Sequence, residues 1–142
     1  MAPLLSLAST VEDFPYLDFD ALQQLAQRTD HVTTDCTCAA DALRGWASLP
    51  ISFPDAQLKK IGTLVASAYE EATFQEYDPD SVGFWSPEAP VAPLYYPANR
   101  CDVWACTVCS RAFLRYVEGG GYFVDPRIRR LTGRMLVDAR LG

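Results

Sequence analysis

Residues 101–124 read CDVWACTVCSRAFLRYVEGGGYFV, and this stretch decides the fold. Two runs rich in β-branched and aromatic residues, 102–105 and 112–117, predict two strands, with a Cys-x-x-Cys turn at 106–109 between them. The three glycines that follow supply the positive φ angles that a hairpin return needs, which makes residues 122–124 the next strand. We therefore expect a small antiparallel sheet in the last third of the chain.

The five cysteines form two groups along the chain: Cys36 and Cys38, then Cys101, Cys106 and Cys109. The two residues between Cys106 and Cys109 allow two thiolates from one tight turn to reach a single ion, as in a zinc knuckle. A structural site needs four ligands, so we predict that Cys36, Cys38, Cys106 and Cys109 bind Zn²⁺, with Cys101 as an alternative ligand. Zinc suits four soft ligands in a tetrahedron, and the spacings usual in iron–sulfur proteins are absent.

Two other uses of the cysteines stay open at this point: burial without a metal, and redox or disulfide chemistry. A thioredoxin-like motif would precede a helix, whereas the segment after Cys109 is predicted to be a strand. The single histidine, His31, is either a fourth ligand, half of a dyad with Cys36, or an ordinary surface residue. Glu118 is the acid best placed for catalysis and equally suits a salt bridge at a strand end. Because nucleotide-binding and nucleophile motifs are absent, we expect no catalytic residues.

Shorter elements are expected before the sheet. Asp20 and Gln23 resemble a capping box for a helix over residues 21–28. A second helix should occupy about residues 37–46, because Pro50 must lie outside it. These patterns make the N-terminal part helical.

The middle of the chain is less regular. A third short helix is predicted from Pro54 to Gly62, in competition with a strand over residues 61–66. Residues 76–100 contain five prolines interleaved with aromatic residues, which favours an ordered loop that covers the core.

After the sheet, Pro126 is expected to break the last strand, and residues 128–136 have the apolar spacing of a short helix. The predicted fold class is therefore α+β: short N-terminal helices, then a small antiparallel sheet with a zinc-knuckle-like hairpin. The length suits a single domain, 1–142, with residues 1–15 flexible.

The composition predicts a cytoplasmic chain without a membrane partner. Acidic Glu12 and Asp13 follow an opening stretch that has no basic residue, which suits neither a secretory signal nor a transit peptide. Uninterrupted apolar runs fall short of the roughly 20 residues that span a bilayer.

The charge is divided unevenly. The net charge is −6, with four basic and 14 acidic residues before Arg100, and eight arginines and four acids from Arg100 onward. The two parts either attract each other or face different partners. Arg127, Arg129 and Arg130 lie near aromatic residues and raise nucleic-acid binding as an alternative, although overall acidity and the scarcity of lysine argue against it.

The last half of the chain resembles a type of small, uncharacterised bacterial protein. The residues that carry the resemblance include Tyr95-Tyr96-Pro97, the Cys-x₂-Cys knuckle and an LRYxEGGGY segment over 114–122. Small acidic bacterial proteins of this kind sometimes act as immunity partners of secreted toxins, which is an analogy of size, charge and setting.

These patterns together predict a small zinc-binding protein that acts by protein–protein interaction. An immunity-type inhibitor would use its acidic part to cover a basic toxin domain, since complementary charge speeds association and adds specificity. The alternatives are a zinc-ribbon nucleic-acid-binding protein that uses the Arg-rich C-terminal part, and a thiol or redox enzyme that uses Cys106 or Cys109.

Overall fold

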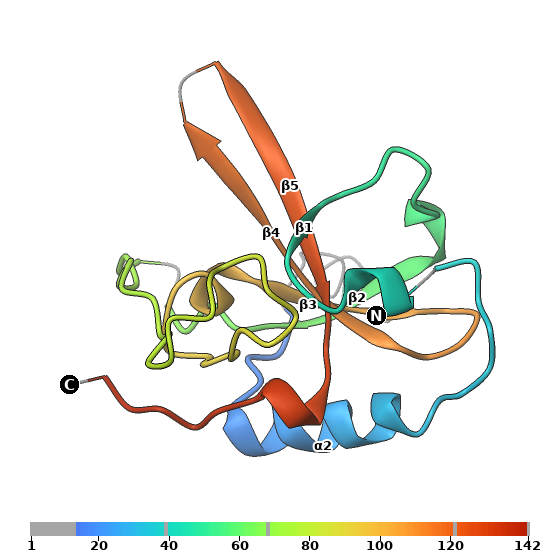
Figure 1. Ribbon diagram of the computed structural model, residues 1–142, viewed down its shortest axis with the longest axis horizontal. Helices are drawn as coiled ribbons and strands as arrows, with labels where there is room; N and C mark the ends of the chain where they lie inside the picture. Colours follow the sequence, from blue (N-terminus) through green and yellow to red (C-terminus); the bar gives the residue numbers. More distant parts are fainter. Residues whose placement is uncertain (1–13, 39, 68, 121, 142) are drawn as a thin grey trace, which may run out of the picture.

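A five-stranded antiparallel sheet forms the centre of the computed structural model (Figure 1). The structure describes residues 14–38, 40–67, 69–120 and 122–141. The strands are β1 (Ala47–Ser48), β2 (Leu58–Thr63), β3 (Asp102–Cys106), β4 (Ala112–Gly120) and β5 (Phe123–Arg130), in the order β1-β5-β4-β3-β2. Within the described ranges the α-helix is α2 (Phe19–Asp30), so the predicted α+β class agrees with the structure.

Strand β4 is buried on both of its faces. Successive side chains of a strand point to opposite sides, and the neighbours Phe113 and Leu114 are both fully buried. Leu114 belongs to the hydrophobic cluster that contains the buried side of α2, whereas Phe113 packs with Leu43 and Phe53 on the other face. The two-sided burial explains why this strand reads as a nearly continuous apolar run instead of an alternating one.

Helix α2 confirms the helix predicted over residues 21–28, but it starts earlier. Asp18 is extended and its Oδ1 accepts a hydrogen bond from the amide of Ala21 at 2.9 Å, so Asp18 is the N-cap. The capping box predicted at Asp20 is therefore wrong, because Asp20 already lies in the first turn. The buried side of α2 consists of Leu22, Leu25, Ala26 and Thr29.

The second predicted helix is reduced to a 3₁₀ turn, Ala40–Leu43. In a helix, Leu43 and Trp46 would share one face, since residues three apart are neighbours on its surface. Here Leu43 packs in the cluster under Phe113, and Trp46 packs in the cluster with Leu114. The chain must turn between these two positions to serve opposite faces of the sheet.

The third predicted helix is likewise wrong. A 3₁₀ turn, Asp55–Gln57, leads directly into β2, so the competing strand prediction is closer, although the strand starts at Leu58 and not at residue 61. The reason is tertiary: β3 presents an edge of unpaired backbone groups, and β2 pairs with it from Leu58 opposite Cys106 to Thr63 opposite Asp102.

Pro126 lies inside β5, so the predicted break is wrong. Pro126 pairs with Val117 of β4, and its carbonyl accepts a hydrogen bond from the amide of Leu49 at 2.7 Å. The amide and carbonyl of a strand residue point to the same side, so the N–H that proline lacks would face the β1 edge and not β4. Further along, the helix predicted over 128–136 shrinks to a 3₁₀ turn, Gly133–Met135.

The loop predicted to cover the core, residues 76–100, is ordered. Isolated bridges join Glu76 to Tyr96 and Val91 to Leu136. Val91 is buried in the cluster that includes α2. Tyr95 is also buried, and Phe84 and Tyr96 pack against this cluster, so the loop contributes aromatic side chains to the core, whereas Trp85 is half exposed.

The N-terminal residues were expected to be flexible. Residues 1–13 lie outside the described residues. Tyr16 forms a parallel bridge with Thr63 of β2, and the carbonyl of Pro15 accepts a hydrogen bond from the Thr63 amide at 3.0 Å. The described part of this segment therefore covers part of the β2 edge.

Arg129 places a positive charge inside the structure, with 1% of its surface exposed. Its guanidinium donates hydrogen bonds to the carbonyls of Arg44 at 2.9 Å, Pro87 at 3.2 Å and Ala89 at 2.7 Å. Burial lowers the pKa of Arg129 to about 10, and the carbonyl groups replace the water that the charge has lost. Arg129 thereby ties β5 to two loops that cover the sheet.

We expect Arg129→Ala to lower the free energy of unfolding by about 3 kcal/mol or more, because three backbone carbonyls lose a buried, charged donor. Arg134→Ala is the matched control, since Arg134 is 76% exposed and its ion pair with Glu88 spans 3.5 Å. The control should change the unfolding free energy by less than about 0.5 kcal/mol. Urea denaturation of both variants measures the difference, and equal losses would contradict this role for Arg129.

Candidate metal centre

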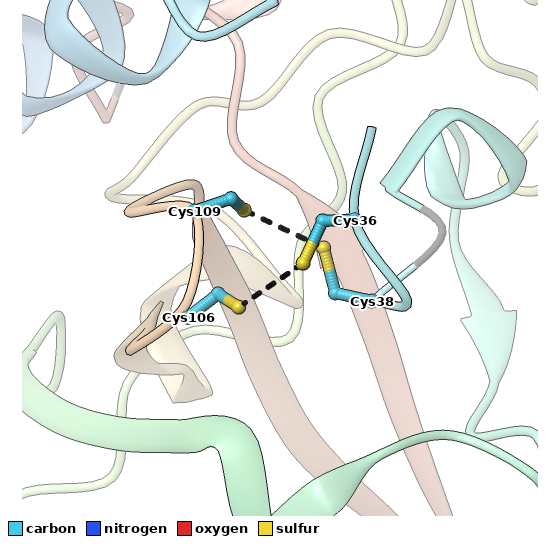
Figure 2. A group of neighbouring side chains, drawn as sticks. All are labelled: Cys36, Cys38, Cys106 and Cys109. Atoms are coloured by element: carbon cyan, nitrogen blue, oxygen red, sulfur yellow. Dashed lines mark hydrogen bonds between the residues drawn. The ribbon is translucent and has the colours of Figure 1, made fainter. Parts of the chain in front are cut away.

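Four cysteines from two distant parts of the chain converge beside the β3–β4 turn (Figure 2). The Sγ atoms of Cys36, Cys38, Cys106 and Cys109 all lie within 4.8 Å of one another. Cys36 and Cys106 are 3.7 Å apart, as are Cys38 and Cys109, and these thiols are free of disulfide bonds. The structure thus brings together the four residues predicted as ligands.

Two of the sulfur–sulfur separations match the edge of a tetrahedral site. Four sulfur ligands at about 2.3 Å from one ion lie about 3.8 Å from each other along the edges of a tetrahedron. A disulfide would require about 2.0 Å. The two separations of 3.7 Å therefore fit four ligands of one ion, and the cluster can hold a metal.

The Cys-x-x-Cys half of the site is a tight turn at the end of β3. The amide of Cys106 donates to the carbonyl of Arg111, and the amide of Ser110 donates to the carbonyl of Cys106, each at 2.8 Å. Ser110 adopts a left-handed conformation with φ of 74°, which reverses the chain. The Arg111 amide then points at the sulfur of Cys109 at 3.5 Å, so a backbone donor can offset thiolate charge.

The other half is an irregular segment that follows α2. It leads from the helix, on one side of the sheet, to the turn at Ala40–Leu43, which contributes to the cluster on the other side (Figure 1). Cys38 is fully buried and Cys36 half-buried at this crossing point. A metal bound here would therefore cross-link the connection between the two covering layers to the sheet.

Gln57 joins the two halves, and sequence reasoning did not find it. Its Nε2 donates toward the sulfur of Cys106 at 3.4 Å and that of Cys36 at 3.7 Å. Its Oε1 accepts from the hydroxyl of Thr37 at 2.6 Å, which fixes the amide orientation. Its backbone carbonyl accepts from both the amide and the hydroxyl of Thr107. The sequence carries no signal for this role, since a glutamine before a strand is common on surfaces.

The thiols have unequal acidity. The backbone amide of Cys38 lowers the pKa of Cys36 to about 7, whereas burial and the neighbouring sulfurs raise the pKa of Cys38 to about 12. Without a cation, four adjacent thiolates would repel one another in a poorly solvated place. A bound divalent ion removes this repulsion, which is why metal binding at such a site releases protons.

The fifth cysteine and the histidine lie away from this cluster. Cys101 is fully buried in the cluster that includes α2, and its thiol donates to the carbonyl of Pro97 at 3.3 Å. His31 is exposed at the end of α2, with Nδ1 2.7 Å from the carbonyl of Gln27. Among the described residues, the Cys₄ cluster is the group of His, Cys, Asp or Glu side chains close enough to hold a metal ion, and it includes neither Cys101 nor His31.

Glu118 occupies the strand-end salt bridge that was one of its two expected roles. It pairs with Arg127 at 3.3 Å and accepts hydrogen bonds from the hydroxyls of Tyr96 and Tyr116. Burial and the Glu118 carboxylate raise the pKa of Tyr96 to about 12, so the phenol stays protonated as a donor. This network attaches β4 to the loop of residues 76–100.

Comparisons with known proteins give no relative: no protein-family model, curated protein or solved structure matches the chain. Among the described residues, no helix has both the length and the apolar character needed to cross a membrane.

We expect Cys38→Ser to abolish stoichiometric metal binding, because it removes a buried sulfur ligand and leaves three. Cys101→Ser is the matched control and should keep full metal content, since its sulfur lies outside the cluster. Elemental analysis of both purified variants measures this. Loss of metal from Cys101→Ser, with its folding intact, would contradict the ligand assignment.

Gln57→Glu should weaken metal affinity about tenfold to a hundredfold, because a carboxylate replaces the amide that donates to two ligand sulfurs. Gln75→Glu introduces the same charge at an exposed position outside the cluster and should leave affinity unchanged. Titration against a competing chelator compares them. An unchanged affinity in Gln57→Glu would show that its hydrogen bonds to sulfur do not affect the metal.

Proposed function

We propose that this chain is a structural-zinc protein that works by binding another protein and has no catalytic role at its Cys₄ centre. The observation that carries the zinc assignment is the convergence of four sulfurs at tetrahedral spacing. A closed site with four protein ligands leaves no position for water or substrate, which is typical of structural zinc.

Zinc is favoured over an iron–sulfur cluster by the compactness of the site. The sulfurs around a cluster bind different iron atoms and lie farther apart than ligands of one ion. Here all four lie within 4.8 Å. Four thiolates also suit zinc better than calcium or magnesium, which prefer oxygen ligands.

A structural role follows from what the site connects. One pair of ligands lies in a connection that crosses between the two sides of the sheet, and the other pair lies in the β3–β4 turn. Tying points about 70 residues apart in the chain reduces the entropy of the unfolded state, as a disulfide does. Zinc would thereby contribute to folding stability.

Protein binding is favoured by the unequal charge of the chain. Fourteen of its 18 acidic residues precede Arg100. An acidic surface of this kind would accelerate encounter with a basic protein. We extend the proposal to an immunity-type inhibitor in a reducing compartment, with a basic toxin domain as its target.

The nucleic-acid alternative is weakened by the environment of the arginines. Arg129 is buried, Arg115 pairs with Asp55 at 2.7 Å, and Arg127 pairs with Glu118. Phosphate binding requires cations that face solvent. Arg115 and Arg129 instead hold the C-terminal strands to earlier parts of the chain, which was the competing explanation of the charge pattern. The guanidinium of Arg127 lies over the rings of Phe84 and Trp85.

The first test is the metal content and thiol reactivity of protein purified without chelator. We expect about one equivalent of zinc, with the four cluster thiols protected from a thiol reagent until a chelator removes the metal. If the purified protein contains iron and not zinc, the zinc assignment is wrong. A metal-free protein with one fast-reacting thiol at Cys106 or Cys109 would instead support the thiol enzyme.

The second test concerns the partner. Zinc-loaded protein should capture a specific protein from a lysate of its own cells, and should inhibit that protein if it is a toxin such as a nuclease. A variant in which surface acidic residues are replaced by lysines should no longer form this complex. A complex that is indifferent to these replacements would contradict the electrostatic mechanism.

A further inference from the structure

A groove lies on the surface where the N-terminal segment, the segment after β2 and the C-terminal end meet. Two adjoining hollows, of about 540 Å³ and about 270 Å³, share Tyr16, Pro93 and Leu94 in their walls. Their volumes together fall within the range of ligand-binding clefts.

The floor of the groove is apolar. Leu64 is buried at its base, and three larger side chains along it are partly exposed: Tyr16 at 45%, Leu94 at 37% and Leu141 at 52%. Isolated exposed apolar side chains are ordinary, but several that line one hollow form a place where an apolar side chain of a partner can be buried.

The rim is acidic. The carboxylates that line the two hollows are Asp18, Asp20, Glu70, Glu71 and Asp138. Asp18 caps helix α2, while the other four have no ion pair among the described residues. The two lining arginines do not balance them, so the groove carries a net negative charge.

Two buried polar atoms in the wall lack partners. Asn99 is 5% exposed; its Nδ2 donates to the carbonyls of Thr73 and Leu94, but its Oδ1 accepts no hydrogen bond from the described residues. Arg100 donates to the carbonyl of Ala72, yet its Nε is also unpaired. A buried polar atom without a hydrogen-bond partner costs free energy.

We infer that this groove binds a basic, amphipathic peptide segment of a partner protein, with an apolar side chain on the floor and lysine or arginine side chains at the rim. The inference rests on the proposed function, because it names the surface and the chemistry through which the partner is recognised. The acidic rim and the apolar floor together favour a basic, amphipathic polypeptide over a small anion or a nucleic acid, whose phosphates the rim would repel.

The test uses the full-length, zinc-loaded chain and a fluorescent peptide of about ten residues, half lysine and half leucine. One control peptide replaces leucine by serine at the same charge, and another replaces lysine by glutamate. The groove variant combines Glu70→Gln, Glu71→Gln and Asp138→Asn. The matched control variant combines Glu76→Gln, Asp80→Asn and Glu88→Gln, which removes the same charge outside the groove.

We expect the lysine–leucine peptide to bind, and the groove variant to weaken binding at least about tenfold while the control variant changes it less than about threefold. The serine peptide should bind much more weakly, which separates groove binding from general attraction to an acidic protein. Equal effects of both variants, or equal binding of the serine peptide, would overturn the inference.

Chemical-shift mapping locates the peptide. Shifts at the methyl groups of Leu64, Leu94 and Leu141 support the groove, and shifts confined to other surfaces overturn it. Overhauser contacts from residues 1–13 to Leu94 in the free protein would assign the groove to the chain's own segment and also overturn it.

The natural partner separates the two proposals. If the groove variant captures that partner as well as the wild type does, the proposed function stands and the groove inference fails. If the peptide binds the groove but no partner is captured, the groove inference stands and the proposed function fails.

Discussion

The rest of the structure depends on the burial of β4 on both faces. Phe113 and Leu114 point in opposite directions and are both inaccessible to water, so each face of the sheet must be covered by other parts of the chain. A chain of this length supplies one α-helix for one face among the described residues, and the remaining cover comes from loops. Loops without regular hydrogen bonding need other attachments. Arg129 provides one through backbone carbonyls, and a metal bound by the four cysteines would provide another.

Two of these attachments act on opposite faces of the sheet. Arg129 faces the side of α2, pairs across from Leu114, and holds two loops through their carbonyl groups. The Cys₄ cluster lies on the other side, because Cys106 is two residues from Trp104 on β3 and packs near Phe113. A guanidinium can donate hydrogen bonds to several converging carbonyls, as Arg129 does. A metal can join segments that have no backbone hydrogen bonds between them, as at the Cys₄ cluster.

The sulfur atoms of the cluster receive hydrogen bonds from N–H groups. Each cysteine segment contributes little regular structure, yet the Arg111 amide and the Gln57 amide both direct N–H groups at sulfur. Such donors disperse negative charge over the surrounding protein. They also orient the sulfurs before a metal arrives, because Gln57 is itself held by Thr37.

The strands of the C-terminal third were predictable because their residues favour extended structure locally and their turns contain glycine or Cys-x-x-Cys. Helix α2 was predictable for the same reason, since its apolar residues repeat at helical spacing. The predictions failed where the local sequence pattern and the tertiary packing disagree. Leu43 and Trp46 have helical spacing but pack on different faces of the sheet. Strand β5 tolerates Pro126 because the proline nitrogen points to the β1 side and not to β4.

The kinds of ligand at the candidate site follow from the sequence alone. Two close pairs of cysteines and one remaining cysteine, with a single histidine, limited the ligands to a few sets before any fold was known. Only the tertiary structure decided among them, because ligand choice depends on distances between segments about 70 residues apart, which no local pattern encodes. Cys101 has the same side chain as its four counterparts, but it lies in the core between the 3₁₀ turn Ala98–Arg100 and β3. Gln57 belongs to the site because it immediately precedes the edge strand β2.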